Sequence, residues 1–218
     1  MNYLSIADAE RFISSALQSA NVPAADADVT ANLMVQSDLV GADGHGIFRL
    51  PAYLKRIRAG GINLHPNIHV EREQGATALI NGDNALGHLV MNKAVELAIE
   101  KVKQHSVCWI GSHYGNHSGA ASVYVRKLAE QGYIGIYMAV GNANHMAPWG
   151  GIDLLLSTNP IAIAVPAGDC PMVLLDIATT VAAYGKVKVA AQKGESIPEG
   201  WMIDRQGKPI TDPKKSSE

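Results

Sequence analysis

The stretch YIGIYMAV at Tyr133–Val140 is a continuous apolar run between Gly132 and Gly141. A run of this length between glycines is typical of a β-strand that is buried on both faces of a sheet. Similar apolar runs at Ile161–Val165 and Val173–Ile177 predict two more strands. The second half of the chain therefore contains a sheet, and the fold class depends on what lies around it.

Helical patterns flank these strands and dominate the start of the chain. Ser5–Asp8 has the form of a capping box and predicts the start of an amphipathic helix. Apolar residues at helical spacing predict a second helix over about 25–39 and a short one around Tyr53–Ile57. Longer helical stripes cover about 87–104 and 180–192. Together with the strands, they predict a mixed α/β protein.

Shorter strand patterns lie between the helices. Strands are expected at Ile68–Val70 and at Thr77–Ile80, the second ending at the polar turn that follows it. Val107–Ile110 is expected to lead into a glycine-rich loop at His113–Gly119, with Ser118 beginning the next helix. We therefore expect a mainly helical part over residues 1–75 and an α/β part over residues 76–218.

Composition narrows the possible functions. The 218 residues are 47% hydrophobic and 17% charged, which is typical of a globular protein. A net charge of −2 gives no electrostatic reason to bind nucleic acid or an anionic membrane. The sequence has no apolar stretch of membrane-spanning length, no signal-peptide pattern and just two cysteines. A soluble, cytoplasmic protein is expected.

Two segments place a histidine beside small residues. They are DGHGIFRLPAY at Asp43–Tyr53, which contains His45, and NHSGA at Asn116–Ala120, which contains His117. Arg49 follows His45 by four residues and is a natural clamp for a carboxylate. An imidazole beside such a clamp predicts acid/base chemistry on a 2-hydroxy or 2-oxo acid.

Other kinds of site fit less well. Asp176 closes an apolar strand, where it is either a helix cap or the partner that orients a histidine, and the two roles are compatible. Gly44 and Gly46 do not have the dinucleotide-binding spacing and do not follow a strand. His113 and His117 lie four apart in a glycine-rich segment, so we expect no metal site.

A series of motifs in order along the chain resembles one family, the non-Rossmann malate/L-lactate dehydrogenases. The matching segments are Asp43–Tyr53, Asn116–Ala120, Gly132–Ile136, Pro148–Gly151, Ser157–Pro160, Asp176–Thr180, Gly185–Lys186, Ile197–Trp201 and Thr211–Pro213. The resemblance implies an unusual α/β fold, bound NAD or NADP, and an intertwined homodimer with its active site near the subunit interface. Relatives carry serine where this chain has Gly44, and they continue beyond Thr211–Pro213 into a Gly/Lys stretch. We therefore expect the C-terminal portion of the family fold to be truncated here.

The resemblance also implies roles for individual residues. His45 corresponds to a proton donor, Asp176 to its partner, and His117 to a proton acceptor. The segment expected to contact the cofactor consists of Asp176, Ile177, Ala178, Thr179 and Thr180, with Gly141 as a further contact. The residues by themselves leave open which histidine carries the proton.

The function expected from these features is hydride transfer between a nicotinamide and a small 2-hydroxy or 2-oxo acid, such as malate, lactate or ureidoglycolate. Arg49 would hold the substrate carboxylate. Two alternatives remain: reduction of a cyclic imine carboxylate on the same scaffold, and an inactive remnant of such an enzyme. The substrate and the choice between NAD and NADP stay open.

Overall fold

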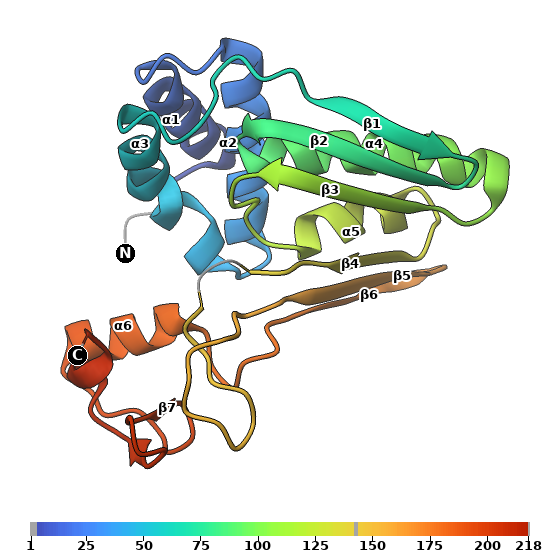
Figure 1. The fold of residues 1–218 in the computed structure, drawn as a ribbon. Helices are drawn as coiled ribbons and strands as arrows, with labels where there is room; N and C mark the ends of the chain where they lie inside the picture. The colour runs from blue at the N-terminus through green and yellow to red at the C-terminus, as the bar shows by residue number, and fades with distance from the viewer. Residues whose placement is uncertain (1–3, 142–143, 218) are drawn as a thin grey trace. The chain divides into compact units, whose positions relative to one another are not determined.

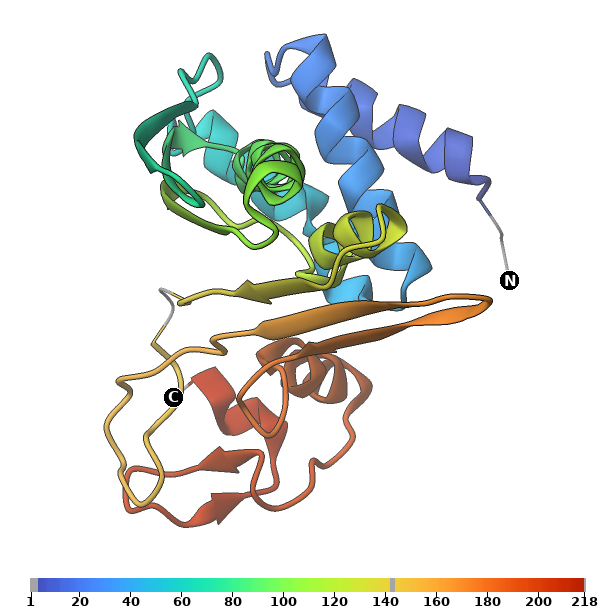
Figure 2. The same ribbon diagram turned by 90° about the vertical axis from the view of Figure 1, so that its right-hand side faces the viewer.

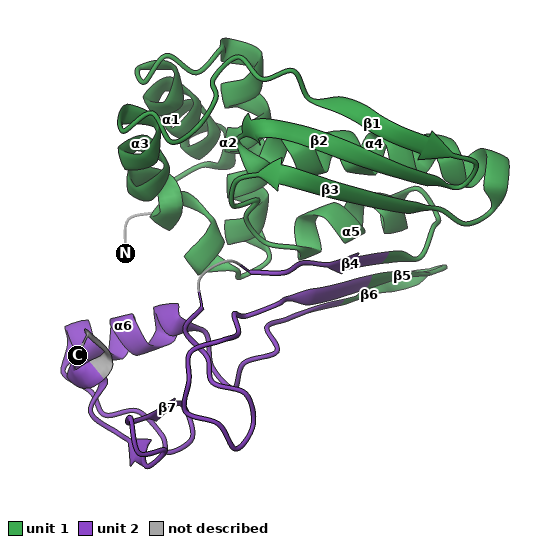
Figure 3. Cartoon of the chain, in the orientation of Figure 1, with its two compact units in different colours: residues 1–135, 164–174 green, residues 136–163, 175–218 purple. Residues whose placement is uncertain are grey.

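The structure is a computed structural model that describes residues 4–141 and 144–217. The chain forms two compact units, coloured separately in Figure 3. Unit 1 comprises Met1–Gly135 and Ala164–Leu174, and unit 2 comprises Ile136–Ile163 and Leu175–Glu218. The expected division into a mainly helical part over residues 1–75 and an α/β part over residues 76–218 stays a prediction. Each unit is described below by itself.

Three helices open unit 1: α1 (Ile6–Gln18), α2 (Ala24–Leu39) and α3 (Leu50–Arg58). The hydroxyl of Ser5 accepts the Asp8 N–H at 3.1 Å, which confirms the predicted cap of α1. Figures 1 and 2 both show α1 and α2 side by side. Their shared apolar core includes Ile13, Leu17, Met34, Leu50 and Tyr53.

A three-stranded sheet completes most of unit 1. β1 (His69–Gln74) pairs antiparallel with β2 (Thr77–Ala85), and β2 pairs parallel with β3 (Trp109–Gly115). Parallel strands need a crossover, which α4 (Gly87–His105) supplies along one face of the sheet (Figures 1 and 2). α5 (Ser122–Glu130) follows β3. The mixed α/β fold class is confirmed.

Several predicted boundaries in this sheet were wrong. β2 does not end at the polar turn but continues to Ala85, with positive φ angles at Asp83 and Asn84. The expected loop at His113 is strand, because His113 pairs with Asn81 across the β2–β3 ladder. Long-range pairing of this kind overrides local glycine content. The helix expected to begin at Ser118 is α5, which begins four residues later at Ser122.

A second sheet has the strand order β4 (Gly135–Met138), β5 (Ile161–Ala167) and β6 (Cys170–Ile177). The predicted β5 and β6 are confirmed, whereas β4 is shorter than the apolar run that predicted it. The expectation that β4 is buried on both faces was wrong, since Ile136 is 57% and Met138 60% exposed. An apolar run indicates that burial of the strand would be favourable, but it does not identify which other residues would bury it.

The rest of unit 2 is built on α6 (Tyr184–Lys193), which starts later than predicted. A short hairpin of β7 (Met202–Ile203) and β8 (Pro209–Ile210) follows, and then the 3₁₀ helix η3 (Pro213–Ser217). Val187, Ala190 and Ile197 form the small core. Within residues 4–141 and 144–217, none of the helices has the length and apolar character needed to cross a membrane.

Candidate active site

Two short 3₁₀ turns of unit 1 carry the first histidine. η1 (Asp43–His45) and η2 (Ile47–Arg49) meet at Gly46. The Asp38 carboxylate, at the end of α2, accepts the N–H of Ile47 at 2.9 Å. A Cβ added to Gly46 would overlap this carboxylate, so glycine is needed for the close approach. The bond from Ile47 to Asp38 holds the histidine turn against α2. Burial also raises the pKa of the Asp38 carboxyl.

The second histidine segment follows β3 and is fixed to the start of α4. The side-chain amide of Asn116 donates to the carbonyl oxygens of Asn84 and Ala85, each at 2.9 Å. A Cβ on Gly87 would overlap the carbonyl oxygen of Asn116 and crowd the His117 backbone. The end of β2, the start of α4 and His117 are therefore packed tightly together.

These segments bring three aromatic rings into contact. The imidazoles of His45 and His117 are stacked, with centroids 5.2 Å apart and planes 11° from parallel. The hydroxyl of Tyr53 lies 2.7 Å from His117 Nδ1. The backbone N–H of Gly119 also donates to that nitrogen, at 3.3 Å. The predicted pair of histidines thus shares one site with a tyrosine that had no predicted role.

Burial and neighbouring charge keep these groups uncharged. Burial, and then the charges of His45, Arg49 and His88, hold the pKa of His117 well below its ordinary value. The His117 side chain nevertheless keeps solvent-exposed surface. Burial raises the pKa of the Tyr53 hydroxyl above its ordinary value. At neutral pH the site contains a neutral His117 beside a protonated tyrosine.

His88 is a site residue that the sequence analysis missed. It lies on α4, fully buried, with its ring edge-on to Tyr53 at a centroid distance of 5.5 Å and an interplanar angle of 86°. Among the residues the structure describes, neither of its ring nitrogens has a hydrogen-bond partner. Burial, with a smaller contribution from His45, lowers its pKa to about 3. Its position directly after Gly87, at a helix start, was the available signal.

Arg49 lies in the same cluster. Its Nε donates to the Gly44 carbonyl oxygen at 3.1 Å, and the residue is half-buried. Its positive charge acts to lower the pKa values of both His117 and Tyr53, although at Tyr53 the opposite effect of burial is larger. Arg49 and Tyr53 are four residues apart, a spacing that places two side chains on one helical face and that could have identified Tyr53. The structure therefore brings His45, Arg49 and His117 together.

Asp176, the predicted partner of His45, lies near the end of β6 in unit 2, where it is exposed. Ile177 ends the same strand, and Ala178, Thr179 and Thr180 follow it. His45 belongs to unit 1, so its pairing with Asp176 stays a prediction.

The predicted cofactor segment packs within unit 2 against Ser157–Asn159. Thr179 donates to the Thr158 carbonyl oxygen from its N–H at 2.8 Å and from its hydroxyl at 2.9 Å. The Gly141 N–H donates to Asn159 Oδ1 at 2.9 Å, and a Cβ there would overlap the Ser157 hydroxyl. Packing against Ser157 therefore accounts for the glycine.

The hydroxyl of Thr180 bears on cofactor binding. It is buried and has no hydrogen-bond partner among the described residues. A buried polar atom of this kind is satisfied when a polar ligand supplies a partner. The segment thus has one buried hydroxyl that a polar ligand could satisfy. Within residues 4–141 and 144–217, no three metal-binding side chains gather closely enough to hold an ion.

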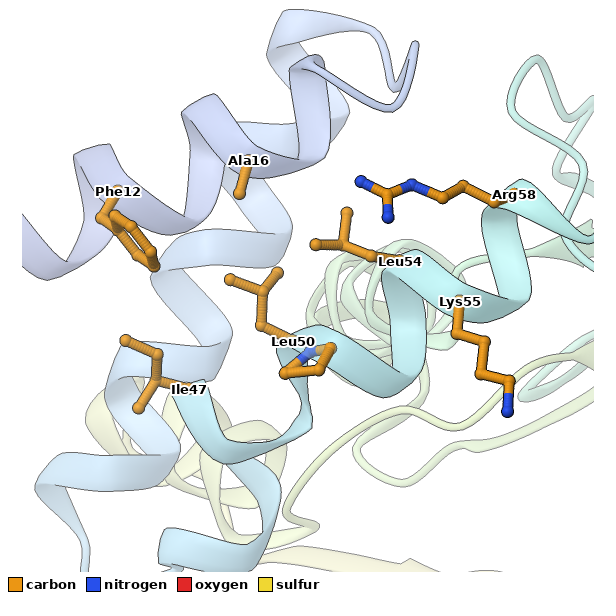
Figure 4. Close-up of a pocket in the computed structure, with 8 residues that line it drawn as sticks. Phe12, Ala16, Ile47, Leu50, Leu54, Lys55 and Arg58 are labelled. Carbon is orange, nitrogen blue, oxygen red and sulfur yellow. The ribbon is translucent and has the colours of Figure 1, made fainter.

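A separate groove of about 570 Å³ lies between α1 and α3. Figure 4 shows Phe12 and Ala16 of α1 facing Leu50 and Leu54 of α3, with the basic side chain of Arg58 nearby. None of its eight lining residues is a histidine or an acid. It therefore lacks the acid/base groups of the histidine cluster.

Comparison with known proteins places this geometry in context. Residues 4–218 match the family model described as malate/L-lactate dehydrogenase. The chain is 44% identical to a malate dehydrogenase of Pyrococcus horikoshii, over 90% of this chain and 54% of that protein. It is 35% identical to ureidoglycolate dehydrogenase (NAD(+)) of Escherichia coli strain K12, over 93% of this chain and 58% of that protein. The chain thus spans somewhat more than half the length of these relatives.

Solved structures agree with the fold. The sulfolactate dehydrogenase from Methanocaldococcus jannaschii superposes with a TM-score of 0.90 at 40% identity, over 99% of this chain and 62% of that one. A delta1-piperideine-2-carboxylate reductase from Pseudomonas syringae pvar. tomato gives a TM-score of 0.93 at 27% identity, over 100% of this chain and 65% of that one.

Proposed function

Because this chain belongs to the malate/L-lactate dehydrogenase family, we propose that it functions in NAD(P)-dependent oxidation and reduction of a small 2-hydroxy/2-oxo acid. The observation that carries the proposal is the stacked pair of His45 and His117, with the charge of Arg49 acting on it. Proton-transfer groups and a carboxylate anchor are the two requirements of this reaction.

Arg49 is proposed to hold the substrate carboxylate. Its Nε is already bonded to the Gly44 carbonyl oxygen, which leaves the terminal guanidinium nitrogens for a ligand. Two parallel N–H donors match the geometry of a carboxylate and fix its orientation. The reacting carbon, which adjoins the carboxylate in a 2-hydroxy acid, would then lie beside the imidazoles.

The imidazoles are proposed to manage the proton on the substrate oxygen. A nicotinamide cofactor would supply the hydride chemistry, and the substrate oxygen must gain or lose a proton when its carbon is reduced or oxidised. His45 and His117 are the candidates, and Asp176 is proposed to orient the His45 ring and stabilise its charged form. The low pKa of His117 favours its neutral form.

The cofactor is proposed to be NAD or NADP. The segment Asp176–Thr180 and Gly141 are the proposed contacts, supported by the partnerless buried hydroxyl of Thr180. The relative named ureidoglycolate dehydrogenase (NAD(+)) supports a nicotinamide cofactor for this lineage. We further propose a homodimer located in the cytoplasm. Exposed apolar side chains such as Phe12 and Phe48 and the free cysteines are consistent with these two proposals.

The test measures NADH oxidation with a panel of 2-oxo acids and with a cyclic imine carboxylate. The imine is included because of the likeness to the piperideine-carboxylate reductase. Each histidine is then replaced singly, as His45→Asn and His117→Asn, and the matched control is His105→Asn at the exposed end of α4. We expect a fall in kcat of about 10²-fold or more in at least one site variant. Unchanged rates in both variants would contradict the acid/base proposal, and reduction of the imine alone would change the substrate class.

A further inference from the structure

The hydrogen bonds around His117 determine which of its ring nitrogens carries hydrogen. A neutral imidazole has one N–H donor and one acceptor nitrogen. Two groups converge on Nδ1: the Tyr53 hydroxyl at 2.7 Å and the Gly119 backbone N–H at 3.3 Å. A hydroxyl can donate or accept, but a backbone N–H can only donate. The Gly119 bond, which is long at 3.3 Å, therefore favours the tautomer in which Nδ1 presents its lone pair.

The surroundings keep the Tyr53 hydroxyl protonated, so it can donate to Nδ1 as well. Tyr53 is 6% exposed, and its ring packs edge-on against the fully buried His88. Burial disfavours its phenolate form, so the hydroxyl keeps its hydrogen. With Gly119 donating to the same nitrogen, the tyrosine hydrogen also points to Nδ1. Both hydrogen bonds are then consistent with the same tautomer of His117, the one with its hydrogen on Nε2.

We propose that Tyr53 is a positioning residue that, with the Gly119 N–H, fixes His117 as the Nε2–H tautomer. His117 would thus act on substrate as a neutral hydrogen-bond donor and not as a proton acceptor. The inference rests on the proposed function for the identity of the substrate, but the tautomer itself does not depend on it. In the reducing direction, Nε2–H donates to the carbonyl oxygen of the 2-oxo acid and polarises the C=O bond.

The division of labour between the histidines follows. As the carbonyl carbon gains hydride, its oxygen gains a proton, and the C=O group becomes CH–OH. His117 keeps its Nε2 hydrogen throughout, so the proton comes from protonated His45, which becomes neutral. Protonation of His117 at Nδ1 would break its bond from Gly119 and add a second positive charge beside His45 at a ring separation of 5.2 Å. The positive charge of Arg49 opposes it further.

The tautomer is tested on the 218-residue chain with ¹⁵N-labelled histidine. Long-range ¹H–¹⁵N correlation distinguishes the protonated from the unprotonated ring nitrogen of each imidazole. The His117 signals, assigned by their loss in His117→Asn, are expected to show hydrogen on Nε2 at pH 7. An Nδ1–H form or a doubly protonated ring at that pH would overturn the proposal.

Tyr53→Phe then tests the positioning role. Removing the hydroxyl should allow both neutral tautomers of His117, seen as averaged nitrogen shifts, and should lower kcat more than it raises KM. The matched control is Tyr133→Phe, since Tyr133 lies outside the cluster, in the turn after α5. An unchanged His117 spectrum in Tyr53→Phe would overturn the role of Tyr53. A chain that shows the Nε2–H form but turns over no hydroxy or oxo acid would contradict the proposed function and leave the tautomer established.

Discussion

The imidazoles of His45 and His117 lie face to face, 5.2 Å between centroids and 11° from parallel. Two imidazoles so close cannot both carry charge at little cost, because each positive charge disfavours the other. Burial is the main cause of the low pKa of His117, and the charge of His45 is the next. The pair is therefore suited to holding one proton at a time.

Replacing His45 with asparagine is expected to raise the pKa of His117. The substitution removes a positive charge that disfavours the protonated ring, while burial continues to hold the pKa below its ordinary value. Proton NMR titration of His117 in His45→Asn and in the unmodified chain measures the change. His105→Asn, at the far end of α4, should leave the titration of His117 where it was. A lower pKa in His45→Asn would contradict the coupling.

Gly46→Ala is expected to destabilise unit 1 and displace the His45 turn. The new methyl group would overlap the Asp38 carboxylate that accepts the Ile47 N–H. Overpacking of this kind costs about 1–3 kcal/mol. Gly44→Ala is the matched control, because a Cβ there meets nothing within 4 Å. Urea unfolding compares the two variants, and equal stabilities would show that Asp38 moves aside freely.

Arg49→Lys is expected to raise the KM for the acid substrate more than it lowers kcat. Lysine keeps the positive charge but lacks two parallel N–H donors and the bond to the Gly44 carbonyl oxygen. Loss of one charge-assisted hydrogen bond costs about 1.5–3 kcal/mol, or roughly tenfold or more in affinity. Arg56→Lys, an exposed change on α3, is the control in the steady-state assay. A KM that does not change in Arg49→Lys would argue for another carboxylate anchor.

Acid is expected to destabilise unit 1 through His88. Its folded-state pKa is lowered to about 3 by burial, whereas the unfolded chain binds the proton near pH 6.5. Between these values the unfolded state binds more protons, so stability falls as pH falls. One such group contributes a slope of up to about 1.4 kcal/mol per pH unit below pH 6.

Unfolding free energies at pH 7 and pH 4.5 check the effect of His88. In His88→Leu, which cannot be protonated, the difference between the two pH values should shrink. His105→Asn, an exposed change on the same helix, should keep the difference seen in the unmodified chain. An equal loss of stability in acid for His88→Leu would place the acid sensitivity elsewhere.

Most helices and part of the site could be predicted from local sequence. α1 and α4 have apolar stripes, and the cap at Ser5 marked the first start, whereas α2 buries residues on several of its faces. The extension of β3 through His113 could not be predicted in the same way, because its pairing with β2 joins residues about thirty positions apart. Glycine-rich sequence there resembled a loop.

The same distinction separates the predicted site residues from the missed ones. His45, Arg49 and His117 carried recognisable chemistry in flexible segments. His88 and Tyr53 looked like ordinary helix residues, and they acquire a role through contact with segments far away along the chain. The burial of Ile136 and Met138 was wrongly expected, because the hydropathy of a residue indicates a preference for burial but does not identify the residues that would pack against it.

Tyr53 is enclosed between His88 and His117, with its hydroxyl bonded at the far end of a buried ring. Its rotamer is consequently settled when the chain folds, and the entropy of ordering it is lost at that stage. Fixing a rotamer-rich side chain during binding typically costs about 0.5–1.5 kcal/mol. On the proposed function, a substrate that reaches His117 meets a preorganised imidazole, and more of the contact energy remains for affinity and for the transition state.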